Sequence, residues 1–282
     1  MNIDQYLQKY HTKETAKSYL YQINHFLKVN SKANMYSYQD ILSYINTIEV
    51  PTKRKNHLAA IKKYYEFLEY TDKRNDHPCK GLTIKLKRSR AIQIQELFTA
   101  EELQKLLTRE NRYKDLELRN KAIISLLIYQ GLQSSELCKL RIQDIDLDKG
   151  TVYIMASKRA TRRTLELHRT QLLVFDKYIY QYRNKLSASK SSKMFFSIRG
   201  LEFNADTLNS IVDPLKMLFL DRNLNPKTIR QSVISNWLNE RKISLSEVQL
   251  MAGHRYPSST EKYRRKDIDN QRKLINKYHP LK

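Results

Sequence analysis

The sequence predicts a mainly α-helical protein with a small antiparallel β-sheet, an α+β fold arranged in two domains. Apolar residues recur at helical spacing through most of the 282 residues. Two short strand-like runs, Thr151–Met155 and Thr164–Leu167, flank a turn and indicate a hairpin. A basic segment at 83–96 follows Pro78 and Gly81 and separates the two parts. We therefore expect a helical domain at 1–82, a linker at 83–96 and a second domain at 97–282.

The N-terminal domain is predicted to hold three helices. In 13–30, Ala16 and Ile23 belong to an apolar face, and Thr12 is the expected N-cap. Helices at 38–48 and 52–70 follow, and the last of them buries Leu58 and Tyr65. Its basic residues fall on another side, which is either a solvated face or a DNA-binding surface. These residues are Lys53, Arg54, Lys55, Lys62 and Lys63.

The linker is strongly basic. Its sequence from residue 83 is TIKLKRSRAIQIQ, and it is expected to lie along a phosphate backbone. The cations that would contact phosphates there are Lys85, Lys87, Arg88 and Arg90.

The second domain is predicted to begin with a helix whose capping box joins Thr99 to Glu102. A mostly apolar helix at 119–130 ends at Gly131, and another starts at Ser134. After the hairpin, we expect helices at 170–186 and 205–221, then one that starts at Asn225-Pro226. A helix capped by Ser244 and Glu247 ends at Gly253, and an amphipathic tail helix covers 266–282.

The turn of the hairpin, 156–163, is densely cationic. It is interpreted as a finger that enters a groove, and the alternative is an exposed basic turn without a function. Its cations are Lys158, Arg159, Arg162 and Arg163.

The charge of the chain points to a polyanionic partner. Lys and Arg total 52 against 29 Asp and Glu, which gives a formal net charge of +23. Nucleic acid is the first candidate, and a merely basic surface or anionic lipid is the alternative. Residues 1–90 hold 17 Lys or Arg and 8 Asp or Glu, so both domains are basic. This distribution favours a clamp around the polyanion.

Other features exclude several classes of protein. Two cysteines, Cys79 and Cys138, form neither a disulfide framework nor a metal-ligand pattern, so neither a metal nor a cofactor is expected. The five glycines form no phosphate-binding loop. The sequence shows no signal peptide, and the longest largely apolar run, 122–129, is too short to span a bilayer. We expect a cytoplasmic protein without a membrane partner.

A nucleophile is predicted near the C-terminal end. Tyr263 is flanked by Lys262, Arg264 and Arg265 and lies nine residues after His254. Cations around a phenol should lower its pKa, and the phenolate can attack phosphorus. Upstream, Lys227 and Arg230 lie one turn apart on a predicted helix.

These residues resemble the motifs of the tyrosine recombinases, the class of phage integrases and Xer-type recombinases. A GL-x-SSEL segment occurs at 131–137, a lysine in a hairpin is Lys158, and an H-x-x-R box is matched by Lys227 and Arg230. The last box is matched by Gly253, His254, Thr260 and Tyr263. The resemblance covers nearly the whole chain. It implies an N-terminal core-binding domain that clamps DNA and a C-terminal catalytic domain.

The resemblance also implies a reaction. The tyrosine attacks a DNA phosphodiester, forms a 3′-phosphotyrosyl link and releases a 5′-hydroxyl, without a cofactor. Arg230, His254 and Lys227 would stabilise the charge at phosphorus, Lys158 would protonate the leaving 5′ oxygen, and Glu136 would orient its neighbours. Site-specific recombination in integration, excision or inversion of mobile DNA is the implied function. The partners would be double-stranded DNA with inverted-repeat sites and further copies of the chain. Four copies would assemble as a tetramer on two sites, with the tail helix 266–282 of each copy docked on a neighbouring copy.

Two positions depart from the family pattern. The first box has Gln133 where the family has arginine, and Lys227 occupies a position that is more often histidine. Arginine offers a fixed fork of donors to phosphate, whereas glutamine offers one uncharged amide. Three hypotheses follow. In the first, the protein is an active recombinase in which another cation (Lys139, Arg141 or Arg159) replaces the arginine. In the second, it is a recombinase whose arginine was lost by natural drift or replaced by an experimenter. In the third, it binds DNA as an architectural or regulatory factor without cutting. A basic RNA-binding protein is the alternative of another class.

Overall fold

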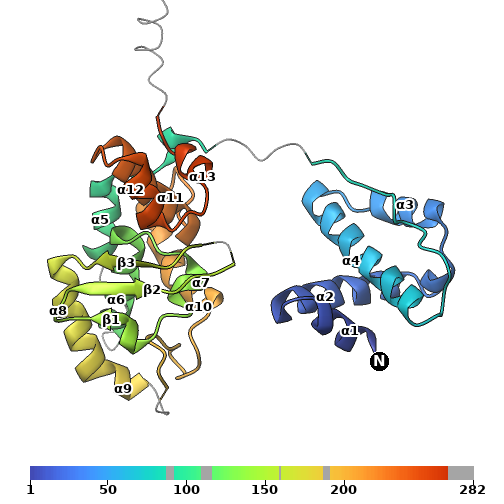
Figure 1. Ribbon diagram of the computed structural model, residues 1–282, viewed down its shortest axis with the longest axis horizontal. Helices are drawn as coiled ribbons and strands as arrows, with labels where there is room; N and C mark the ends of the chain where they lie inside the picture. Colours follow the sequence, from blue (N-terminus) through green and yellow to red (C-terminus); the bar gives the residue numbers. More distant parts are fainter. Residues whose placement is uncertain (87–91, 109–115, 159, 187–190, 266–282) are drawn as a thin grey trace, which may run out of the picture. The chain divides into compact units, whose positions relative to one another are not determined.

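The protein divides into two compact units, Met1–Ser89 and Arg90–Lys282. The computed structural model describes residues 1–86, 92–108, 116–158, 160–186 and 191–265 (Figure 1). Helices dominate both units, and a three-stranded antiparallel sheet lies in the second. The predicted fold class, mainly α with a small antiparallel sheet, is confirmed. The division falls within the segment that we predict to be a linker.

The first unit is a bundle of helices around its own core. Thr12 and Ser37 cap two of the helices through their side-chain oxygens. The first helix was not predicted, although Asn2 and Gln5 form a capping box at its start. Phe26 and Tyr65 are fully buried at the centre of the bundle. The elements are α1 (Ile3–Tyr10), α2 (Lys13–Val29), the 3₁₀ turn η1 (Ala33–Met35), α3 (Tyr38–Asn46) and α4 (Pro51–Tyr70).

The second unit is built around α6 (Glu117–Tyr129), whose residues 122–128 are all buried. Helices on different sides of α6 contact it, as expected for a helix that is apolar all round. They are α5 (Ala100–Thr108), α8 (Arg169–Lys177) and α11 (Pro226–Asn239). The remaining helical elements are η2 (Ile94–Glu96), α7 (Ser134–Leu137), η4 (Ile142–Asp144), the π-helical turn η5 (Tyr178–Tyr182), α9 (Arg183–Leu186), α10 (Ala205–Val212), η6 (Asp213–Leu218), α12 (Leu245–Ala252) and α13 (Pro257–Glu261).

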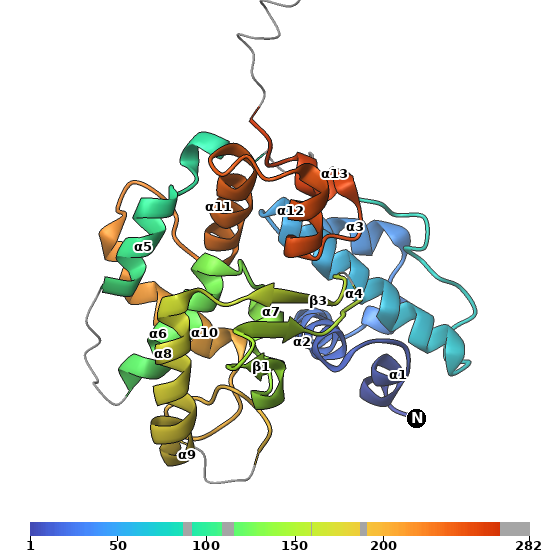
Figure 2. The same ribbon diagram turned by 60° about the vertical axis from the view of Figure 1, so that its left-hand side comes forward.

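The sheet has the strand order β1-β2-β3, with β1 at Ile145–Asp146, β2 at Thr151–Ile154 and β3 at Arg163–Glu166. In the β2–β3 register, Val152 pairs with Leu165 and Ile154 with Arg163. Side chains on β3 alternate between buried and exposed, so Arg163 and Leu165 point to the interior. β1 was not predicted, because two residues carry no readable alternation. Helix α12 packs next to β3, as seen in the view of Figure 2.

Two predicted helices differ from the structure. The helix predicted at 205–221 is α-helical only to Val212 and continues as a 3₁₀ turn to Leu218. Pro214 explains the change, because it lacks an N–H for the α-helical hydrogen bond. The helix predicted at 170–186 includes five residues in π-helical geometry. The predicted tail helix lies outside the described residues. Within the described part of the chain, no helix combines the length and the apolar character that crossing a membrane requires.

Candidate active site

Helix α11 carries several of the residues that build the site, among them Lys227 and Arg230. Asn225 caps its N-terminus by accepting hydrogen bonds from the N–H groups of Lys227 and Thr228, each at 3.0 Å. Arg230 faces the interior and donates to the carbonyl oxygens of Gly131 and Ala252, at 2.5 and 2.6 Å. Arg230 thereby joins the chain just after α6 to the end of α12.

Arg230 is a buried cation, with 8% of its surface exposed. The nearest acidic group is Glu136, whose Oε2 lies 4.0 Å from Nη1 of Arg230. Burial lowers the pKa of Arg230 from its usual range, and Glu136 opposes that shift. Arginine nevertheless remains charged in proteins. The site therefore holds a permanent positive charge in a poorly solvated position, which suits an anionic substrate.

Glu136 is shared between two arginines. Both of its oxygens accept from Arg163, with Nη1 to Oε1 at 2.8 Å and Nη2 to Oε2 at 3.0 Å. Oε2 also accepts from the backbone N–H of Gln133 at 2.8 Å. The two side chains of the bidentate pair are only 4% and 5% exposed. Arg163, which we predict from the sequence as an exposed DNA contact, is thus buried inside the site.

Gly253 ends α12 in the left-handed conformation, with φ at +67°. The predicted helix end is confirmed, since Gly253 and His254 donate back to Leu250 and Gln249. A β-carbon at residue 253 would also lie 2.4 Å from Nη1 of Arg163. Glycine is therefore required both by the backbone and by the close approach of a buried arginine.

His254 follows this turn and is held by Thr260. Its Nδ1 lies 2.8 Å from the hydroxyl oxygen of Thr260, which is fully buried on α13. The imidazole ring is stacked near Tyr263, with ring centroids 6.2 Å apart. Burial, with help from the charges of Arg230 and Arg163, lowers the pKa of His254 to about 4. His254 is consequently neutral at pH 7 in the protein without DNA.

Tyr263 is anchored to α11 through its backbone, and its side chain lies beside Gln231 of the same helix. Asn239 donates to the Tyr263 carbonyl at 2.7 Å and accepts from the Arg265 N–H at 2.8 Å. The side chain of Gln231 lies close enough to the Tyr263 hydroxyl to lower the pKa of the phenol. Sequence reasoning missed Gln231 and Asn239; only their position on the helix of Arg230 could have drawn attention to them.

The pKa of Tyr263 is raised, not lowered as we predict from its cationic neighbours. Burial raises the pKa of the phenol and outweighs the opposing influence of Gln231 and Arg230. Lys262, Arg264 and Arg265 are exposed, so water screens their charges. The predicted lowering of the Tyr263 pKa is wrong for the protein without DNA. The prediction considered only the cations adjacent in the sequence, and the burial of the phenol cannot be read from the sequence.

The hairpin turn is attached to the glycine-histidine segment. The N–H of Thr161 donates to the Gly253 carbonyl at 3.1 Å, and Ala160 forms an antiparallel bridge with His254. Lys158 lies exposed at the turn itself. The arrangement places the segment that carries Lys158 directly against the segment that carries His254.

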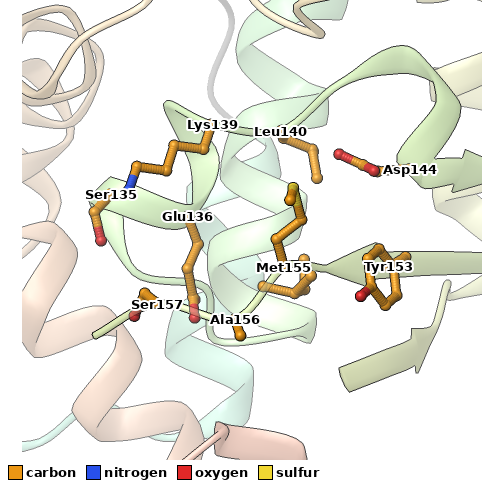
Figure 3. A pocket seen from close by; sticks show the side chains of 10 residues that line it. Ser135, Glu136, Lys139, Leu140, Asp144, Tyr153, Met155, Ala156 and Ser157 are labelled. Atoms are coloured by element: carbon orange, nitrogen blue, oxygen red, sulfur yellow. The ribbon is translucent and has the colours of Figure 1, made fainter. Parts of the chain in front are cut away.

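A small pocket of about 30 Å³ lies between α7 and the start of this turn. In Figure 3, the Glu136 side chain extends from α7 toward Ala156 and Ser157, and Lys139 lies along the rim near Ser135. A volume of this size holds one or two water molecules. The pocket therefore leaves little space around Glu136 for anything larger than water.

Lys227 opens onto a larger hollow of about 430 Å³. It is exposed, and Arg222, Asn223 and Gln231 line the same hollow. Gln231, which lowers the pKa of the Tyr263 phenol, is therefore a neighbour of both Lys227 and Tyr263. Lys227 is thus placed where an approaching anion would meet a mobile ammonium group.

The other predicted DNA contacts lie in varied surroundings. Lys62 donates to the Lys80 carbonyl at 2.8 Å, Lys63 pairs with Glu66 at 2.6 Å, and the Nε of Arg54 donates to the Ile48 carbonyl. The exposed predicted contacts are Lys53, Lys55, Lys85 and Arg162. Four predicted contacts, Lys87, Arg88, Arg90 and Arg159, lie outside the described residues. Lys139 and Arg141, named as replacements for the missing arginine, are also exposed.

Nothing among the described residues forms a metal centre, since no three His, Cys, Asp or Glu side chains come close enough together. The chemistry that the described site offers is electrostatic and nucleophilic: a tyrosine, a neutral histidine and two buried guanidinium groups around one carboxylate.

Comparisons with known proteins agree on one family. The model of the phage integrase family matches residues 96–269. A tyrosine recombinase of Agathobacter rectalis is 25% identical, over 98% of this chain and 93% of that protein. The tyrosine recombinase XerD of Vibrio cholerae serotype O1 is 26% identical, over 89% of this chain and 82% of that protein.

Solved structures support the fold. The XerH site-specific recombinase in its pre-cleavage complex with difH substrate superposes with a TM-score of 0.68 at 17% identity. The superposition covers 92% of this chain and 78% of XerH. At such low identity the likeness concerns the fold.

Proposed function

The chain belongs to the phage integrase family of tyrosine recombinases, and from this membership we propose that Tyr263 is the nucleophile that breaks and rejoins DNA. Family membership makes the protein a DNA breaking-rejoining enzyme of site-specific recombination. The observation that carries the residue assignment is the convergence of Tyr263, His254 and Arg230 around α11.

The proposed reaction exchanges one phosphodiester for another. The Tyr263 oxygen forms a bond to phosphorus as its proton passes to solvent water, and the bond from phosphorus to the 5′ oxygen breaks. Lys158 gives a proton to that leaving oxygen, so a free 5′-hydroxyl results. Rejoining reverses these steps with the 5′-hydroxyl of another strand. No external energy source is required, since the phosphotyrosyl link retains the energy of the broken phosphodiester bond.

The surrounding charges act on the transition state. Negative charge grows on the non-bridging oxygens of the phosphate as the tyrosine attacks, so buried cations lower the barrier selectively. Arg230 is such a cation, and Lys227 can move toward the phosphate from the neighbouring hollow. A phosphate beside His254 would raise the pKa of the imidazole above its low value in the free protein, and so favour a donor form.

Both units are proposed to contact duplex DNA. The first unit would use the basic side of α4, and the second would use the hairpin turn with Arg162. Inverted-repeat sites, a tetramer on two sites, and tail residues 266–282 on a neighbouring copy are further parts of the proposal. The dense positive charge supports the DNA contacts, and the family supports the assembly.

Covalent trapping tests the proposal. A duplex site is first selected from a random library by the Tyr263→Phe variant, which binds but cannot attack. A nick close to the cleavage position then lets the short fragment diffuse away, so an attacked strand remains attached to the protein. The adduct is detected on a denaturing gel.

We expect an adduct with the wild-type protein and none with Tyr263→Phe. Tyr256→Phe is the matched control, because Tyr256 lies in the same segment but is 63% exposed. An adduct that persists in Tyr263→Phe would refute the nucleophile. No adduct from wild-type protein on tightly bound DNA would instead favour a DNA-binding protein that does not cut.

A further inference from the structure

Gln133 leaves the site one guanidinium short of the family pattern, and the structure contains a candidate for it. Gln133 precedes α7, and its backbone N–H already donates to Glu136. The same carboxylate is held by the guanidinium of Arg163 from β3. Arg163 therefore brings a planar, permanently charged group next to the position that Gln133 leaves uncharged.

Arg163 also contacts the segment that carries His254. Nη1 of Arg163 packs so closely on Gly253 that no β-carbon fits between them. Arg163 and Arg230 share Glu136, since Nη1 of Arg230 is 4.0 Å from the oxygen that Nη2 of Arg163 contacts. The two guanidinium groups and the imidazole thus belong to one cluster.

The charges in this cluster do not balance. Two buried arginines face one buried glutamate, and His254 is neutral at pH 7. Buried charges are normally paired, but here one of the two buried positive charges has no negative partner. A bound anion would supply that partner. The Nε of Arg163 is in addition buried without a hydrogen-bond partner among the described residues. An unused buried donor of this kind calls for an acceptor.

We propose that Arg163 is the second guanidinium of the phosphate clamp: it donates to a non-bridging oxygen of the scissile phosphate while Glu136 fixes its orientation. This inference rests on the proposed function, and it identifies the first of the hypotheses for Gln133 as the correct one. The replacement for the family arginine comes from the strand beside the turn, not from Lys139, Arg141 or Arg159. It makes the chain an active recombinase despite Gln133.

The test compares rates of adduct formation at saturating protein, so that differences in DNA affinity cancel. Arg163→Gln in the full chain should slow the reaction by about 10²- to 10³-fold, as expected when one donor to a developing charge is lost. Arg169→Gln, at an exposed arginine of the same domain, is the matched control and should stay within about threefold of wild type.

A second substrate separates a phosphate contact from a structural ion pair. A methylphosphonate at the cleavage position replaces one charged oxygen by a neutral methyl group, so its transition state needs one positive charge fewer. The ratio of wild-type to Arg163→Gln rates should shrink there to about tenfold or less. A structural ion pair predicts the same ratio on both substrates, and that result would overturn the proposal.

Two further variants guard against misfolding. Arg163→Met combined with Glu136→Leu removes the Arg163–Glu136 ion pair and leaves the net charge of the cluster at +1, as in the wild type, because Arg230 remains; the fold is therefore expected to be retained. We expect this protein to remain slow on the phosphate substrate, and a rate within threefold of wild type would disprove the role of Arg163. Glu136→Gln keeps Arg163 and should lose less activity than Arg163→Gln. An equal loss would mean that Arg163 acts only through Glu136.

The outcomes also separate this inference from the proposed function. If wild-type protein gives no adduct, both fall. If wild-type protein gives an adduct that depends on Tyr263 but not on Arg163, only the assignment of Arg163 is wrong.

Discussion

Gly253 and Arg163 are fitted to each other: a β-carbon on the glycine would lie 2.4 Å from Nη1 of the arginine. The close approach connects the end of α12 with the start of β3 and brings a buried guanidinium against the backbone that positions His254. The glycine of the glycine-histidine pair is thus part of the geometry of the site as well as the end of a helix.

Gly253→Ala should lower the free energy of unfolding by more than the cost of placing alanine in the left-handed conformation. The conformation costs about 1–2 kcal/mol for alanine, and the collision with Arg163 should add about 1–3 kcal/mol. Gly150→Ala is the control, because Gly150 has a similar φ of +64° but only an ordinary contact of 3.8 Å with Leu172. The measurement is the urea dependence of unfolding. Equal losses for the two variants would contradict the collision.

Arg230→Lys should impair both chemistry and stability. Lysine keeps the charge but cannot donate to Gly131 and Ala252 in the same fork geometry. We expect adduct formation to slow by about 10²- to 10³-fold and the free energy of unfolding to fall by about 1–3 kcal/mol. Arg241→Lys, just beyond the same helix and exposed, should change neither. A stable Arg230→Lys protein with wild-type rates would refute the clamp.

The pH dependence of stability should contain a contribution from His254. Its folded pKa of about 4 lies below the ordinary value of 6.5, so the unfolded chain binds more protons between these pH values. The contribution is fully present above pH 6.5 and is lost as the pH falls toward 4. His254→Gln should flatten the fall in unfolding free energy over this window. An unchanged slope would show that His254 is not held neutral.

DNA binding should raise the pKa of the same imidazole, because a phosphate favours its protonated form. NMR titration of the His254 ring, alone and with the selected duplex bound to Tyr263→Phe protein, measures this shift. A pKa that stays near 4 with DNA bound would mean that the phosphate does not approach His254.

Lysines of α4 should differ in their contribution to nonspecific DNA binding. Lys55 is exposed, whereas Lys63 is already paired with Glu66 at 2.6 Å. Lys55→Ala should reduce the slope of log affinity against log salt by about 1, the value for one phosphate contact. Lys63→Ala should reduce it less, because its charge is partly neutralised. Fluorescence anisotropy with a random duplex over a range of salt gives both slopes, and the prediction fails if they coincide.

The sequence predicted those parts of the fold that local chemistry specifies. Helix starts are marked by hydrogen bonds within four residues of the chain. Examples are the cap at Asn225, followed by Pro226, and the capping box of Ser244 with Glu247. Gly253 marks a helix end because few other residues adopt its backbone angle. These signals need no knowledge of the remaining chain, so the structure reproduces them.

The site could be predicted only in part, because its electrostatics depend on burial. Arg162 and Arg163 look alike in the sequence, but Arg162, just before β3, is exposed, whereas Arg163, the first residue of β3, is buried against Glu136. Likewise, the cations beside Tyr263 in the sequence are in water, and the raised pKa of the phenol comes from packing. Gln231, which contacts Tyr263, carries no signal of its own.

The pairing of β2 with β3 has a consequence for engineering the hairpin. Because Ile154 faces Arg163, a one-residue shift of the strands would turn Arg163 outward and present Arg162 or Thr164 to Glu136 instead. Lengthening or shortening the turn between Ala156 and Arg162 is therefore safe only if the strand pairing is preserved. Strand register therefore decides whether Glu136 meets Arg163 or one of its two neighbours in the sequence.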